Sequence, residues 1–366
     1  INTSAGVGQI EGIPSTEARG AYGGSDDEDN SGILRFVSIR HGGTEIGEGN
    51  EINGLTMGAV GSGTTIEFVE VINNKDDGFE WFGGTVHCRY LVAAFCGDDA
   101  FDYDEGFRGR GQYWFAIMRD DGNGEGDKGG EHDGGTDPED GEPYSMPVIA
   151  NVTYIGPGSD VGGGVLNIRD NAGGKYYNSI FMDFEGGASV EDLESGADSR
   201  QRLSDGELVL ANNIWYSIGD DALLADIASG QTYLRNHLQD NDNDVSDPAL
   251  TEISRSTNAK LDPRPTAESP AFENVGSPDD DTDFIQSVDY RGAFSRYDLW
   301  IRDWTALDEY GFVVPKGAVV EVTDEDILPG QEVDWTNDNT YLLNGFVFVD
   351  DGAVLNIEAG TVIKGA

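Results

Sequence analysis

The chain has 366 residues, in which 69 Asp and Glu stand against 22 Lys and Arg, so it carries a formal net charge of −47 at pH 7. Charge of this size repels nucleic acid and anionic membrane surfaces, and it favours bound cations or a saline medium. Aromatic residues make up 10% of the chain, which argues against disorder, and no stretch approaches the 18 apolar residues that indicate a membrane span. We therefore expect a folded protein without nucleic-acid partners and without membrane insertion.

Short apolar strands recur along the first part of the chain, at 34–43, 66–84, 88–106, 112–122, 148–158, 178–187 and 210–224. The best-matched pair is Asp76–Trp81 and Asp98–Tyr103, which lie 22 residues apart. A coil of about 22 residues that stacks on the next coil predicts an all-β fold, a right-handed parallel β-helix. A sandwich or a propeller is the alternative, although both fit better with hairpins every 8–12 residues.

This register predicts which side chains fill the interior of the coils. Side chains on a strand alternate between its two faces, and the residues expected to point mostly inward are Phe68, Val71, Phe79, Tyr90, Val92, Phe101, Phe115 and Ile117. Asparagines recur at similar strand positions, at Asn151, Asn178 and Asn212–Asn213. They suggest a ladder at one corner in which each side chain bonds the backbone of the neighbouring coil, and ordinary turn chemistry is the alternative.

The pattern divides the chain into a body and a C-terminal part. The body, residues 1–298, contains an acidic, Gly-rich loop at 119–147, an insertion at 189–208 with room for one short helix, and an irregular segment at 239–295. Apolar side chains at helical spacing in Leu299–Leu307, followed by Gly311, predict a capping helix over 299–312. Residues 313–333 are expected to be a linker.

Residues 334–366 form a fresh pair of alternating strands, like the opening coil of a β-helix. A coil without a neighbour exposes unpaired backbone groups that another chain can pair with. We therefore expect this segment to serve the next repeat or to be donated to a neighbouring subunit, in a head-to-tail arrangement that builds a filament.

Acidic side chains cluster where two coils would stack. With a 22-residue coil, Asp77 lies over Asp99 and Glu80 over Asp102, and stacked carboxylates repel unless a cation bridges them. This predicts a calcium site built from Asp76, Asp77, Glu80, Asp98, Asp99, Asp102 and Asp104. The alternative is that these acids simply face water.

Two further segments are candidate calcium sites. The first half of an EF-hand loop is matched by Asp121, Asn123, Glu125 and Asp127, with Gly126 at the sixth position, but His132 stands where a glutamate is expected. Asp240, Asp242 and Asp244 alternate in a third acidic segment that lacks the glycine. A solvated acidic loop is an equally good interpretation there.

The sequence assigns no catalytic residue. Arg108 and Arg110 follow the first acidic cluster and are candidate bases of a calcium-dependent lyase, although arginines among so many acids more often neutralise them. No G-x-S-x-G motif occurs, and four scattered histidines give no support to Ser/His/Asp catalysis. Cys88 and Cys96 are equally consistent with a disulfide and with buried thiols.

Several separated motifs together resemble a known family. They include ILRFVSIRHGG at 33–43, DGFEWFGGTV at 77–86, GDDAFDYDEGF at 97–107 and YLLNGFVFVDDGAVLNIEAGTVIKG at 341–365. They look like the large secreted β-helix proteins of Bacteroidetes-type bacteria, which belong to the pectate-lyase-like fold group and are often cargo of type IX secretion. In that family the segment like 341–365 comes first, whereas here it comes last.

The resemblance implies an extracellular or cell-surface location and carries no catalytic residues. Together with the acidic clusters, it leads us to expect a calcium-stabilised structural or adhesive module whose partners are copies of itself or the next tandem repeat. The alternative is a polysaccharide lyase or hydrolase that acts on an acidic or marine glycan.

Overall fold

The computed structural model describes residues 6–10, 12–44, 46, 52–120, 127–135, 138–219, 223–358 and 360–365. The chain divides into two compact units. The body comprises residues 1–249, 269–293 and 304–306, and the C-terminal unit comprises residues 250–268, 294–303 and 307–366.

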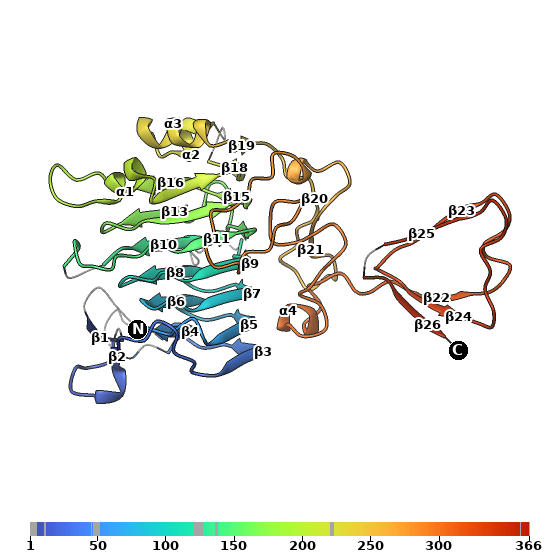
Figure 1. The fold of residues 1–366 in the computed structure, drawn as a ribbon, viewed down its shortest axis with the longest axis horizontal. Coiled ribbons are helices and arrows are strands. Elements are labelled where there is room, and N and C mark those ends of the chain that lie inside the picture. The colour runs from blue at the N-terminus through green and yellow to red at the C-terminus, as the bar shows by residue number, and fades with distance from the viewer. Residues whose placement is uncertain are drawn as a thin grey trace. The chain divides into compact units, whose positions relative to one another are not determined.

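The body is a parallel β-helix, which confirms the predicted fold class. Within each of its two main sheets, neighbouring strands belong to successive coils (Figure 1). One sheet has six strands: β4 (Leu55–Gly58), β6 (Phe79–Phe82), β8 (Phe101–Asp104), β10 (Gly130–Asp133), β13 (Gly164–Arg169) and β16 (Gly186–Val190). The two best-matched coils pair Phe79 with Phe101, which is the 22-residue offset expected.

The other main sheet has eleven strands. Its long strands are β3 (Ile33–Arg40), β5 (Thr65–Ile72), β7 (His87–Ala94) and β9 (Arg110–Ile117). Further along, each coil contributes two short strands in their place: β11 (Val148–Ala150) and β12 (Thr153–Ile155), β14 (Gly174–Tyr177) and β15 (Ile180–Phe184), β17 (Leu208–Ala211) and β18 (Ile214–Ile218), with β19 (Asp244–Val245) after them. A small antiparallel hairpin, β1 (Val7–Gln9) and β2 (Ala21–Gly23), precedes these strands.

A left-handed residue bends the long strands of the eleven-stranded sheet. Phe68, Tyr90 and Tyr113 have φ angles of 55°, 56° and 59°, a conformation that L-residues rarely adopt. The three rings stack on one another, with centroids 4.3 and 5.0 Å apart, and this stacking offsets part of the backbone strain. The later coils hold asparagine, which tolerates this conformation better, at the same corner: Asn151, Asn178 and Asn212.

The bend shifts the alternation of side chains. In β5, Ile66 and Val69 both face the core although they lie three residues apart, because Phe68 occupies the corner between them. The prediction of core residues is therefore confirmed for some of these residues and wrong for others. Val71, Phe79 and Phe101 lie in the interior. Phe68 and Tyr90 stay half-buried at the corner, and the buried residues Val92, Phe115 and Ile117 face the opposite side of the sheet because they alternate with the core residues Leu91, Trp114 and Ala116.

The asparagine ladder exists, but most of its partners differ from those expected. The side chains of Asn151, Asn178 and Asn212 bond backbone groups of residues 274–290 instead of the neighbouring coil. Of these four asparagines, only Asn213, one residue past the corner, bonds the backbone of the coil beside it, donating to Tyr176 O and accepting from Ser179 N.

Short helices lie in the insertions and at the end of the coils. Helix α1 (Ser199–Asp205) falls in the 189–208 insertion, where the Asp198 side chain accepts from Gln201 N and Gly206, with φ of 77°, ends the helix. The core is covered by α2 (Leu224–Ile227) and α3 (Thr232–Asp240), which bury apolar side chains into it (Figure 1). The predicted cap at 299–312 differs: it contains only the four-residue helix α4 (Ala306–Glu309). No helix in the described part of the chain is both long and apolar enough to cross a membrane.

The C-terminal unit contains an antiparallel pair, β20 (Leu250–Glu252) and β21 (Asp262–Pro265), and a second small parallel stack. The stack consists of β22 (Val319–Val322), β23 (Glu332–Trp335), β24 (Thr340–Leu343), β25 (Val354–Ile357) and β26 (Val362–Gly365). It again pairs residues 22 apart, as in Tyr341 with Ile363. Residues 313–333, expected to be a linker, thus supply the first strand of this stack.

Candidate metal site

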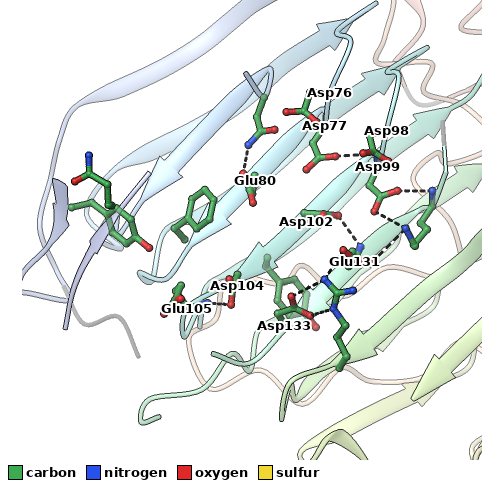
Figure 2. Close-up of a pocket in the computed structure, with 17 residues that line it drawn as sticks. Asp76, Asp77, Glu80, Asp98, Asp99, Asp102, Asp104, Glu105, Glu131 and Asp133 are labelled. Carbon is green, nitrogen blue, oxygen red and sulfur yellow. Dashed lines mark hydrogen bonds and ion pairs between the residues drawn. The ribbon is translucent and has the colours of Figure 1, made fainter. Parts of the chain in front are cut away.

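Ten carboxylates line one pocket of about 510 Å³ in the body (Figure 2). Its floor is the six-stranded sheet, and its acids come from strands β6, β8 and β10 and from the turns before and after them. All seven residues of the first predicted cluster line it: Asp76, Asp77, Glu80, Asp98, Asp99, Asp102 and Asp104. The structure therefore brings this cluster together at one place.

One column of the pocket is built by the turns that precede successive strands. The backbone N–H of Asp99 donates to Oδ1 of Asp77 over 3.0 Å, and the backbone N–H of Lys128 donates to Oδ1 of Asp99 over 2.6 Å. Each acid thus accepts from the residue one coil further along the chain. The column therefore consists of Asp77, Asp99 and Lys128 in successive coils.

A second column stands on the strands themselves. Glu80 pairs in register with Asp102, and Asp102 Oδ1 accepts from the backbone N–H of Glu131 over 2.7 Å. Asn53 donates its side-chain N–H to Glu80, which fixes that carboxylate at the edge of the pocket. These side chains point away from the core because Phe79, Trp81 and Phe101, their neighbours on the strands, point into it.

The innermost carboxyl groups are poorly solvated. Asp99 is only 3% exposed, and burial raises its pKa to about 7, aided by the charge of Asp98 although Lys128 opposes the shift. Burial also raises the pKa of Asp77 and of Asp102 well above the usual range, and the neighbouring carboxylates add to both shifts. Ionising all three groups is therefore unfavourable without a cation.

Two basic side chains of the pocket neutralise part of this charge. Lys128 Nζ lies 2.6 Å from Asp127 Oδ2 and 3.5 Å from both Asp99 and Glu131. Arg169 bonds Asp133 and Glu131, each at 2.8 Å. Two cations against ten carboxylates leave a large negative excess in the pocket.

The geometry suits a hard divalent cation. Three sets of acids place one oxygen from each member within 4.8 Å of the others: Asp76, Asp77 and Asp98; Asp77, Asp99 and Asp102; Asp98, Asp99 and Asp127. Calcium takes six to eight oxygen ligands at 2.3–2.6 Å, and many of them are carboxylates. Because these sets share members, the pocket offers adjoining positions for an ion, and the donors are all oxygen.

The other two predicted calcium segments have different surroundings. Asp121, Asn123 and Glu125 lie outside the described residues, while Asp127 adjoins the pocket through Asp98 and Asp99. Asp244 binds the buried guanidinium of Arg291 at 2.6 Å. In the described part of the chain, Asp240, Asp242 and Asp244 do not join any group of three acids close enough to share an ion.

Several residues of the pocket were not predicted from the sequence to belong to this cluster, among them the four charged residues Lys128, Glu131, Asp133 and Arg169. Three of them lie in the segment interpreted as a surface loop, where the structure instead has strand β10. The sequence does contain a pattern that indicates their position, since DKGGEHD at 127–133 repeats the pattern of DDGFEWF at 76–82 and DDAFDYD at 98–104. This third copy does not fit the 22-residue period, because an insertion lengthens its coil to 29 residues.

Arg108 and Arg110, the candidate lyase bases, do not line the pocket. Arg108 bonds Asp27 at 3.3 Å, and Arg110 bonds Asp280 and Asp281 at 2.9 and 2.5 Å. Both arginines are partners of carboxylates, as the charge-neutralising alternative predicts. Cys88 and Cys96 are free and buried, and burial raises the pKa of each thiol to about 12.

Comparison with known proteins agrees with the fold. A family described as pectate-lyase like beta helix domain matches residues 5–259 of the chain. No curated protein matches the sequence, and no solved structure does.

Proposed function

Since the chain belongs to the family of pectate-lyase-like β-helix domains, we propose that it is a structural or adhesive module outside the cell or on its surface, stabilised by calcium in the acidic pocket. The resemblance of its motifs to secreted proteins of Bacteroidetes-type bacteria supports this location, and export by type IX secretion is part of the same proposal. Its partners are copies of itself or the next tandem repeat.

One observation carries the calcium proposal. Asp77, Asp99 and Asp102 place an oxygen each within 4.8 Å of one another, while burial raises the pKa of all three. A protein that keeps such a cluster needs either protons or a cation to fold around it. At neutral pH calcium is the better partner, because several carboxylates can bind one ion together.

A calcium titration of the chelator-treated protein tests this proposal. Isothermal calorimetry should detect binding at the pocket, and Asp77→Asn together with Asp102→Asn should abolish it. A matched control, Asp205→Asn together with Asp351→Asn, removes two charges from exposed side chains and should leave binding unchanged. Wild-type protein that binds no calcium would overturn the proposal.

The small C-terminal stack supports the proposed assembly. Leu355 packs on the buried side chains of this stack, but Ile357 on the same strand face remains 50% exposed. Phe346 is 86% exposed, and Phe348 is also exposed. We propose that a further coil, from another copy or from the next repeat, covers these side chains.

Hydrodynamic measurements test the assembly. The protein should associate at high concentration, and Ile357→Asp together with Phe346→Asp should keep it monomeric. Tyr310→Asp, which also places a carboxylate on an exposed side chain of the C-terminal unit, is the control. If wild type and both variants sediment alike at every concentration, this part of the proposal is wrong.

An enzyme that acts on an acidic glycan is the second candidate, because the pocket is open and its acids lie beside Lys128 and Arg169. Neither cation of the pocket is a free base, since both are held by carboxylates and the pKa of Lys128 is raised. Incubation with polyuronates separates the two functions. Unsaturated products or new reducing ends that disappear in Asp99→Asn would establish the enzyme.

A further inference from the structure

One face of the body, which we call the groove because residues 274–293 lie along it, consists of outward-facing side chains of the eleven-stranded sheet. Strand register places these side chains in two adjacent columns. The first column is His87, Arg110, Val148, Lys175 and Val209; the second is Arg89, Gln112, Ala150, Tyr177 and Ala211. The groove thus combines an apolar floor with three cations, in a chain that has only 22 Lys and Arg.

Residues 274–293, which we call the strap, lie along this groove. Lys175 binds Asp279 at 2.5 Å, and Arg110 binds Asp280 and Asp281. Burial opposes the ionised form of Asp280, but hydrogen bonds from Ile285 and Thr282, together with the one from Arg110, hold its pKa low, at about 2. Three consecutive acids therefore dock on cationic side chains of a protein with a net charge of −47.

Apolar and amide contacts fix the register of the strap. The Arg89 guanidinium lies over the ring of Phe284, with its central carbon 3.9 Å from the ring centroid. Ile285 packs on the apolar floor formed by Val148, Ala150, Tyr177 and Ala211. The Gln112 side chain both donates to Gln286 O and accepts from Gln286 N. At the corner, Asn178 likewise donates to Gly276 O and accepts from Gly276 N. This is recognition of an extended peptide, with charge, an apolar anchor and paired backbone bonds.

The path of the chain makes this segment suitable for exchange between molecules. The strap belongs to the body, yet the residues before it, 250–268, and those after it, 294–303, belong to the C-terminal unit. An identical strap on a second molecule offers the same contacts, which is the condition for domain swapping.

We propose that the groove is a recognition site for an acidic peptide, filled in one molecule by its own strap and able to take the strap of a second copy. The inference rests on the assembly proposed above and deepens it, because it names a surface and a partner segment. Exchange ties the C-terminal unit of one copy to the body of the next.

A labelled peptide of residues 274–293 tests the groove, at one fixed calcium concentration. Asp279→Asn together with Asp281→Asn weakens the strap at two exposed carboxylates, and Phe284→Ala weakens it without changing its charge. Fluorescence anisotropy should show that both variants bind the peptide about tenfold more tightly than wild type, since each groove is more often vacated. Arg110→Glu in the weakened protein should abolish binding.

The controls separate recognition from charge and from misfolding. Asp205→Asn together with Asp351→Asn removes two charges elsewhere and should leave peptide binding at the wild-type level. Circular dichroism and melting temperature report whether each variant is folded. Folded weakened variants that bind the peptide no better than this control would overturn the inference, as would retention of binding after Arg110→Glu. Calcium binding at the acidic pocket and association through Ile357 are measured separately, so their outcome does not depend on this one.

Discussion

The backbone N–H of Asp99 donates a 3.0 Å hydrogen bond to Oδ1 of Asp77 in the preceding coil. Coil spacing therefore holds two buried acids side by side, about 4.8 Å apart along the stack. They cannot separate without breaking the parallel pairing of β6 with β8. Their repulsion must be relieved chemically, by a proton or by a cation.

Calcium should stabilise the protein at neutral pH. A site filled at 100 times its dissociation constant contributes about 2.7 kcal/mol, which corresponds to a rise in melting temperature of about 3–8 °C. Differential scanning fluorimetry with chelator and with calcium measures the difference at moderate salt. Magnesium at the same concentration is the control for general screening of the −47 charge, and an equal shift with both ions would contradict a specific site.

Asp99→Asn should raise stability without calcium and reduce the gain from calcium. The substitution keeps the shape of the side chain and removes a buried charge that is unfavourable in the empty pocket. The melting temperature in chelator should therefore lie above that of wild type, while saturating calcium adds less. Asp351→Asn, in an exposed turn, should change neither value.

The pH dependence of the calcium-free protein follows from the pKa of Asp99, which is raised from 3.8 to about 7. Within this window the folded state binds more protons than the unfolded state, so stability falls as pH rises. The stabilising contribution of protonated Asp99 to the unfolding free energy is fully present below pH 3.8 and is lost as pH rises through about 7. The difference in unfolding free energy between Asp99→Asn and wild type should widen from pH 5 to pH 8 in chelator. A constant difference across that range would show that Asp99 titrates normally.

Phe101→Ala should cost about 3–5 kcal/mol of unfolding free energy. The ring is fully buried and stacks between Phe79 and Trp114, with centroids 5.3 and 5.0 Å away, so truncation leaves a cavity that these rings cannot fill. Phe346→Ala removes an equally large but exposed ring and should change stability by less than about 0.5 kcal/mol. Chemical denaturation gives both values. Similar costs for the two variants would place Phe101 outside the core.

The sequence predicts the parallel stacking and the first acidic cluster because both depend on a repeat of 22 residues. Phe79 over Phe101 and Asp77 over Asp99 follow directly from that offset. Prediction from the sequence fails where side chains depart from simple alternation between the two faces of a strand. The sequence gives no sign that Phe68 is left-handed, since aromatic residues rarely adopt this conformation. The contacts that offset its strain, such as stacking on Phe36 and Tyr90, come from neighbouring coils.

The positions of Lys128 and the strap could not be predicted from the sequence for a related reason. Lys128 occupies the place of Asp77 and Asp99 in a third copy of the pattern, but an insertion displaces it from the 22-residue period. The strap has no strand pattern at all, because its backbone bonds go to side chains such as Asn178 and Gln112 instead of to a ladder. Contacts between Asp280 and Arg110, 170 residues apart, are set by the path of the chain and not by local sequence.

Lys128 is one of the two cations in the acidic pocket, and its removal should make the protein more dependent on calcium. Without this ammonium group, Asp99 and Asp127 lose the positive charge within 3.5 Å, and Glu131 keeps only that of Arg169. Lys128→Asn should therefore lower the melting temperature in chelator, and calcium should restore more stability than it adds to wild type, since the ion then relieves repulsion that the lysine had offset. Lys316→Asn is the matched control, because Lys316 pairs with a single exposed acid, Asp303, and exposed pairs contribute little. The measurement is the shift in melting temperature between chelator and saturating calcium for the three proteins. Equal shifts in Lys128→Asn and wild type would mean that calcium does not bind beside Asp99, and would move the proposed ion to the Asp76, Asp77 and Asp98 side of the pocket.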